Sequence, residues 1–174
     1  MPQQELISDI LGRHAAEIGY ASLPPEEIAA AKESLIDTLA VAVGARHAPG
    51  TAQVLDVARR EGSAGASTVW DTGERMSARN AGFVNSVYAA ALDYDSLHHL
   101  AVAHSDIVVV PTAVAVAEAA GASGRELLAA TALACCGALS QPAIQLQQRA
   151  IQHAGPVGEL FGREPFFRAV ASSP

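Results

Sequence analysis

Residues 23–45, LPPEEIAAAKESLIDTLAVAVGA, carry the clearest signal for the fold. Proline is tolerated in the first turn of a helix, and the acids Glu26 and Glu27 favour the positive end of the helix dipole. The large apolar residues recur at helical spacing on one side: Ile28, Leu35, Ile36, Leu39 and Val43. The stretch therefore predicts a helix that begins in the Pro24–Pro25 pair and runs to about Val43, before Gly44.

The same alternation of helix and short loop continues along the chain. We expect helices over 3–19, from Thr51 (as a cap) to about 60, from 78 to about 92 with Ser77 as N-cap, from 109 to about 120 with Pro111 in the first turn, and from Ser123 to about 136. Residues 68–70 form a short extended piece that turns at 71–73 and is too brief to imply a sheet. The pattern predicts an all-α, multi-helix bundle.

The character of the sequence changes after Cys136. Residues 137–174 hold a glutamine-dense run at 141–152 and three of the four phenylalanines of the chain. Residues 142–153 are interpreted as one further helix, and the rest is broken by glycine and proline. We expect a helical domain over residues 1–136 and a divergent, partly irregular tail over residues 137–174.

Composition excludes several classes of function. Eleven basic against 18 acidic residues give a net charge of −7, without the basic stripe that nucleic acids or anionic membranes attract. The longest low-charge stretch, 107–116, is too short to span a bilayer. The chain begins without the apolar core of a signal peptide, and its two adjacent cysteines make no disulfide framework. We therefore expect a cytoplasmic protein.

Titratable side chains are densest in residues 92–110, LDYDSLHHLAVAHSDIVVV. Asp93, Asp95, His98, His99 and His104 fall within twelve residues, between two strongly apolar segments. Carboxylate and imidazole groups suit proton transfer, which favours an acid–base site in which Asp93, Asp95 and His98 converge. Three alternatives stay open: a solvated helix cap, a metal site of Asp and His ligands, and a hydroxyl nucleophile at Ser96 or Ser105.

Four motifs in this order resemble the MmgE/PrpD family, which includes 2-methylcitrate dehydratase, cis-aconitate decarboxylase and iminodisuccinate epimerase. Residues 23–45 resemble its N-terminal helix, and residues 77–95, SARNAGFVNSVYAAALDYD, are similar to the helix that leads to its D-F-D-D-T-H segment. Residues 104–133, HSDIVVVPTAVAVAEAAGASGRELLAATAL, resemble its H-P-S-x-x-V-x-P-A helix and the Ser-Gly-x-Glu-Leu helix start that follows. The resemblance covers about residues 5–135, so the chain corresponds to the N-terminal part of the family's helical domain.

The resemblance implies roles for four residues. Asp93, Asp95 and His98 match the D-F-D-D-T-H motif, and His104 matches the histidine of the H-P pair. Asp93 and His104 would be the catalytic residues, and Asp95 and His98 would bind a small polycarboxylate substrate, with no metal or organic cofactor. Ser96 and Leu97 stand where the motif has Asp and Thr, Ala90 replaces an earlier histidine, and Ser105 replaces the proline.

The implied activity is that of a dehydratase-like lyase, and the implied assembly is a homo-oligomer. Family members are longer, so the expected protein is a truncated and weak or inactive enzyme. Two other functions are open. One is a non-catalytic helical dimerisation or interaction module, and the other is a metal-dependent helical hydrolase that uses His98, His104 and Asp93.

Overall fold

The computed structural model describes residues 12–13, 16–62, 64–98 and 103–138. This part of the chain forms a 3-10 turn, η1 (Tyr20–Ser22), and two short strands, β1 (Ser67–Thr68) and β2 (Arg75–Met76). Its α-helices are α2 (Pro25–Gly44), α3 (Thr51–Arg60), α4 (Ala78–Ala90), α5 (Asp106–Ala120) and α6 (Gly124–Ala138). The predicted all-α bundle is confirmed, and the two strands are a small addition to it.

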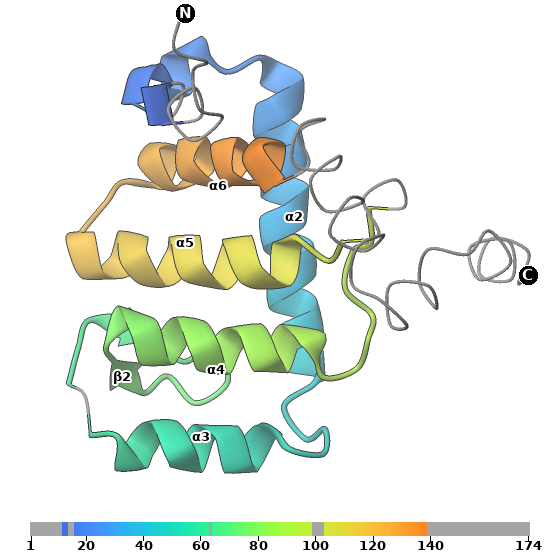
Figure 1. Ribbon diagram of the computed structural model, residues 1–174, viewed down its shortest axis with the longest axis vertical. Coiled ribbons are helices and arrows are strands. Elements are labelled where there is room, and N and C mark those ends of the chain that lie inside the picture. The colour runs from blue at the N-terminus through green and yellow to red at the C-terminus, as the bar shows by residue number, and fades with distance from the viewer. Residues whose placement is uncertain (1–11, 14–15, 63, 99–102, 139–174) are drawn as a thin grey trace, which may run out of the picture.

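Four helices lie side by side in the order α6, α5, α4, α3, and α2 crosses this layer (Figure 1). α2 contacts α4, α5 and α6, while α4 also contacts α3 and α5. The main core lies around α4, where Val84 and, on α5, Val110 are fully buried. The backbones of α4 and α5 come close at Gly82, where an added Cβ would lie 3.6 Å from the Cβ of Ala115.

Small side chains mediate the packing of α2 on the layer. Its buried residues, Ala31, Thr38 and Ala42, lie on one stripe of the helix. On the side that carries the large apolar residues, Ile36 is 69% exposed and Val43 is 44% exposed. Because the distance between packed helices depends on the side chains at the contact, the small stripe lets α2 approach three helices at once.

The start of α5 differs from the prediction. The helix begins at Asp106, three residues before the predicted start at Val109, so Pro111 lies inside the helix and not in its first turn. Proline has no N–H to donate to the preceding turn. Pro111 is nevertheless fully buried, so its apolar ring contributes to the core.

Two predicted helix caps have different outcomes. Ser77 is the N-cap of α4 as predicted, because its side chain accepts a hydrogen bond from the Asn80 N–H at 3.3 Å. The cap of α3 is instead Gly50, whose φ of 93° lies in the left-handed region that favours glycine. Thr51 is the first residue of that helix, and its hydroxyl donates back to the Ala48 carbonyl at 2.7 Å.

The extended piece predicted at residues 68–70 is part of a short hairpin, which its brief apolar run does not by itself imply. β1 pairs with β2 in antiparallel register, with Ser67 opposite Met76 and Thr68 opposite Arg75. So short a ladder has little stability of its own. It forms here because α4 and α5 supply hydrogen bonds to β1 from their side chains.

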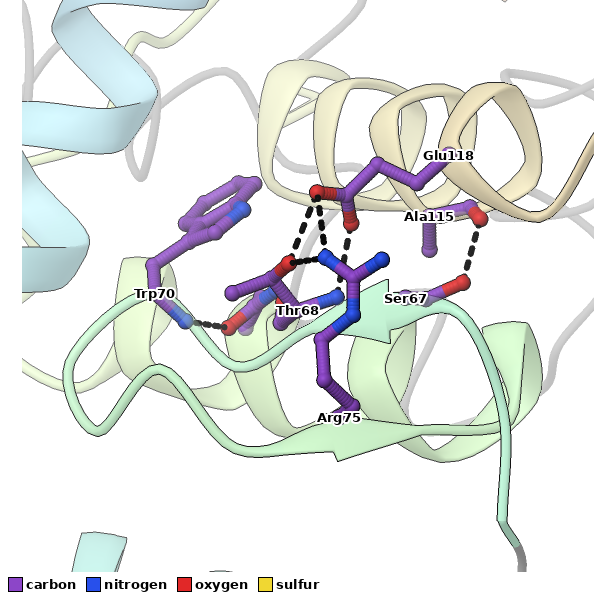
Figure 2. Close-up of polar contacts among 7 residues, drawn as sticks. Ser67, Thr68, Trp70, Arg75, Ala115 and Glu118 are labelled. Atoms are coloured by element: carbon purple, nitrogen blue, oxygen red, sulfur yellow. Dashed lines mark hydrogen bonds and ion pairs between the residues drawn. The ribbon is translucent and has the colours of Figure 1, made fainter. Parts of the chain in front are cut away.

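Two helix side chains satisfy the edge of β1 that faces away from β2. The Thr68 N–H and hydroxyl donate to Glu118 of α5, at 2.6 Å and 2.7 Å (Figure 2). Asn85 of α4 donates to the Thr68 carbonyl at 2.9 Å and accepts from the Trp70 N–H at 3.0 Å. The Ser67 hydroxyl donates to the Ala115 carbonyl at 2.6 Å. An exposed strand edge is thereby paired without a third strand.

Several predicted segments lie partly or wholly outside the described residues. Of the helix predicted over 3–19, the described residues 12–13 and 16–17 are helical. The helix predicted over 142–153 and the tail from residue 139 onward lie outside the described part. In the part that the structure describes, no helix combines the length and apolarity needed to cross a membrane.

Candidate active site

The titratable segment lies between the end of α4 at Ala90 and the start of α5 at Asp106. α4 and α5 pack side by side, so the segment leaves and re-enters the same part of the core (Figure 1). Its two arms are joined by an antiparallel backbone bridge between His98 and Ala103. The His98 N–H donates to the Ala103 carbonyl at 3.0 Å, and the Ala103 N–H donates back at 3.4 Å. This bridge brings residues from both arms together.

Asp95 and His104 form the central contact of the segment. His104 Nδ1 lies 2.6 Å from Asp95 Oδ2, so a protonated Nδ1 donates to the carboxylate. The Asp95 side chain is 3% exposed, whereas that of His104 is 37% exposed. A buried carboxylate thus holds an accessible imidazole. That arrangement fixes the orientation and the tautomer of a histidine that transfers protons.

Asp93 lies beside this pair and has an unusual backbone conformation. Its φ is 56°, and it is the non-glycine residue with positive φ in the described part of the chain. Aspartate is among the few residues that adopt this conformation readily, because its short side chain can hydrogen-bond locally. One ligand-capable atom each of Asp93, Asp95 and His104 lies within 4.8 Å of the others. The exposed Asp93 therefore completes a three-residue cluster.

The membership of the cluster differs from the predicted convergence of Asp93, Asp95 and His98. His104 joins the two aspartates, and His98 does not belong to the group of ligand-capable atoms. His98 contributes instead the backbone bridge to Ala103. His99 lies outside the described residues. The predicted roles of Asp93, His104, Asp95 and His98 in catalysis and substrate binding remain predictions.

Asp106 is the residue of this region that sequence reasoning missed. It is 8% exposed and lies in the first turn of α5. Its Oδ2 accepts from the Ser96 hydroxyl at 2.8 Å, and its Oδ1 accepts from the Ser105 hydroxyl at 3.2 Å. The Cys135 thiol of α6 lies 3.7 Å from Oδ1. The available signal was an acid directly before a long apolar run, which marks a helix start.

The cluster offers the donor types of a metal site. Asp93 and His104 belong to the set considered for a hydrolase, but the third member is Asp95 and not His98. Bond lengths of about 2.1 Å in a tetrahedral zinc site separate neighbouring ligand atoms by roughly 3.4 Å. The 2.6 Å contact between Asp95 and His104 is shorter, so an ion using these two atoms would have to break their hydrogen bond.

A separate apolar groove of about 510 Å³ runs between α5 and α6. Val108, Val116 and Leu127 line it, together with alanines and one acid, Glu126. Val108 is 61% exposed and Val116 is 54% exposed. None of the three cluster residues lines this groove, so the apolar groove and the acid–base groups are distinct features of the described residues.

The fold and the cluster together define a helical domain that carries an aspartate–histidine pair between two core helices. The family model of the MmgE/PrpD N-terminal domain matches residues 9–138. The chain therefore belongs to the MmgE/PrpD family, and the match lies in the family's N-terminal domain. No curated protein and no solved structure matches the chain.

Proposed function

We propose that this chain carries the acid–base residues of a dehydratase-like lyase that acts on a small polycarboxylate such as 2-methylcitrate. The observation that carries the proposal is the contact of 2.6 Å between buried Asp95 and accessible His104. Membership of the MmgE/PrpD family supports the reaction class. In this proposal His104 transfers the proton, and Asp95 acts through His104 without touching the substrate.

The proposed reaction is the elimination of water. With Nδ1–H donated to Asp95, the lone pair of His104 Nε2 takes a proton from the carbon next to a substrate carboxylate. The electron pair of that C–H bond becomes the new C=C bond, and the hydroxyl group leaves the neighbouring carbon. The proton on Nε2 passes to the departing hydroxide, which becomes water, so the side chains end unchanged.

Asp93 is proposed to orient the substrate. Its exposed carboxylate accepts a hydrogen bond from the substrate hydroxyl and thereby sets which C–O bond lies beside His104. The cluster contributes two carboxylates and one imidazole, so cationic groups elsewhere must bind the carboxylates of the substrate. His98, which forms the backbone bridge with Ala103, is proposed as a polar contact at the rim of the site.

Turnover of 2-methylcitrate or citrate, followed by the absorbance of the enoate product, tests this function. Asp93→Asn is a sharp variant because asparagine also tolerates the left-handed backbone of residue 93, so it removes charge without a new backbone conformation. We expect Asp93→Asn and His104→Ala to abolish turnover. His47→Ala, in the connection between α2 and α3, is the matched control and should leave turnover unchanged.

Two results would contradict the proposal. Absence of turnover in the purified wild-type chain with both substrates would refute activity of this chain. Turnover that survives in folded His104→Ala would refute the assignment of His104. Circular dichroism of each variant separates these outcomes from loss of the fold.

A second candidate function is association between two copies of the chain, with the α5–α6 groove as the contact. Exposed Val108 and Val116 along an apolar groove support it, because such patches are typical of protein interfaces. Light scattering at several concentrations should detect a dimer. Val116→Asp should dissociate it, while Val57→Asp, at a similarly exposed position on α3, should not. A strict monomer at every concentration would refute it.

A further inference from the structure

The buried carboxylate of Asp106 is hydrogen-bonded to both arms of the segment that carries the acid–base pair. Ser96 directly follows Asp95, and Ser105 directly follows His104. The hydroxyls of both serines donate to Asp106, at 2.8 Å and 3.2 Å. The two neighbours of the Asp95–His104 pair therefore converge on the same side chain.

The surroundings of Asp106 suit a fixed negative charge. Its carboxylate accepts from two hydroxyls and lies near the Cys135 thiol at 3.7 Å, so donors from two separate elements surround it. It also lies in the first turn of α5, where the helix dipole favours an anion. A buried carboxylate with these partners has few alternative orientations, which makes it a rigid anchor.

Three contacts connect the two arms of the segment. The backbone bridge between His98 and Ala103 joins the two arms that carry Asp95 and His104. Asp106 joins the same arms a second time, through the residues that follow Asp95 and His104. Two further connections between the arms thus accompany the Asp95–His104 hydrogen bond.

We propose that Asp106 is a positioning residue that keeps the Asp95 carboxylate and the His104 imidazole within hydrogen-bonding distance. It acts through Ser96 and Ser105 and touches neither the imidazole nor the substrate. An effect of Asp106 on catalysis rests on the proposed lyase function. Its effect on the Asp95–His104 hydrogen bond does not, because that bond is present in the protein without substrate. Loss of the anchor should free His104 to change its tautomer.

The tautomer of His104 gives a readout that does not depend on turnover. In protein labelled with 15N-histidine, two-bond proton–nitrogen correlation spectra distinguish a ring protonated at Nδ1 from one protonated at Nε2. The spectra are recorded at mildly alkaline pH, where an ordinary imidazole is neutral. The wild-type protein should show the Nδ1–H form, because Nδ1 donates to Asp95.

Ser96→Ala is the decisive variant because it removes one hydroxyl and leaves Asp106 in place. We expect it and Asp106→Asn to shift His104 toward a mixture of tautomers. The exchange variant Ser96→Asp/Asp106→Ser restores one carboxylate and one hydroxyl across the same contact and should recover the Nδ1–H form. Ser22→Ala is the matched control, because the Ser22 hydroxyl donates to the Gly19 carbonyl in the N-terminal turn.

The kinetic readout uses the same variants. If the wild-type chain turns over 2-methylcitrate, Ser96→Ala should lower kcat by up to about 100-fold with little change in KM, because misplaced reacting groups slow the chemical step. An unchanged His104 tautomer in folded Ser96→Ala and Asp106→Asn would overturn the inference. A wild type without turnover but with the expected tautomer shifts would refute the lyase function and support the anchor.

Discussion

Replacing Glu118 by alanine tests whether one carboxylate holds the β1–β2 hairpin on α5. Oε2 accepts the Thr68 N–H at 2.6 Å, and Oε1 accepts the Thr68 hydroxyl at 2.7 Å. Hydrogen bonds to charged groups contribute about 1.5–3 kcal/mol each, and partial exposure to water places these two at the low end. We therefore expect Glu118→Ala to lower the free energy of unfolding by about 3 kcal/mol.

Two further variants separate the hydrogen bonds between Glu118 and Thr68 from the contacts of Arg75. Glu118→Gln keeps the shape and one acceptor oxygen, so it should cost about half as much as Glu118→Ala. Arg75 Nη1 lies 3.8 Å from Glu118 Oε1 and donates to the Thr68 hydroxyl oxygen at 2.8 Å, and the arginine side chain is 58% exposed. An exposed ion pair contributes about 0–1 kcal/mol and a hydrogen bond about 0.5–1.5 kcal/mol, so Arg75→Ala should cost about 1–2 kcal/mol, less than Glu118→Ala.

Urea unfolding measures all three variants with two probes. Trp70 is the single tryptophan of the chain and lies in the hairpin, so its fluorescence reports this element directly. Circular dichroism reports the helices. A value for Glu118→Ala within about 0.5 kcal/mol of wild type would refute the role of these hydrogen bonds. A cost for Arg75→Ala equal to that of Glu118→Ala would show that the contacts of Arg75 stabilise the hairpin as much as those of Glu118.

Three other predictions concern the packing and the charges of the fold. An added Cβ at Gly65 would lie 2.1 Å from the Met76 carbonyl oxygen, so Gly65→Ala should lower the free energy of unfolding in urea by about 2–3 kcal/mol. The buried Thr38 hydroxyl has no hydrogen-bond partner among the described residues, so Thr38→Val should raise that free energy by about 1 kcal/mol; a loss would contradict this. The Arg59 guanidinium lowers the pKa of Glu74 below its ordinary value of 4.5, so Glu74 stabilises the fold above that pH, and the stabilisation is lost as the pH falls through the lowered pKa. Thermal melts should therefore show the stability advantage of wild type over Glu74→Gln shrinking in acid, and a constant advantage would refute the pairing.

The existence of the helices could be predicted because their signals are local. Ser77 caps α4 and accepts from the Asn80 N–H, three residues along the chain. The hairpin could not be predicted in this way, because the side chains that satisfy β1 come from Asn85 and Glu118, which lie 17 and 50 residues beyond Thr68. The buried face of α2 could not be predicted either, because it depends on how α2 packs against α4, α5 and α6.

The cluster of Asp93, Asp95 and His104 lies in the segment that the sequence singles out, but the contacts within it could not be predicted. The density of acids and histidines singles out residues 92–110 as the candidate segment. The expected convergence of the two aspartates with His98 assumed that near neighbours in sequence meet in space. His104, nine residues after Asp95, meets it instead because the backbone bridge between His98 and Ala103 folds the segment back on itself. Spacing in the sequence does not encode that closure.

Two departures from the family motifs differ in their effect on the polar contacts of the site. D-F-D-D-T-H has an aspartate at the position of Ser96, and H-P-S-x-x-V-x-P-A has a serine at that of Asp106. In this chain the two residue types are exchanged across one hydrogen bond of 2.8 Å, so a carboxylate and a hydroxyl are both retained. A single replacement would have left two buried like charges or none. Leu97, in contrast, is 47% exposed and cannot hydrogen-bond as the motif's threonine does. The first departure keeps the anchor beside Asp95 and His104, whereas the second removes a polar group from the surface of the site.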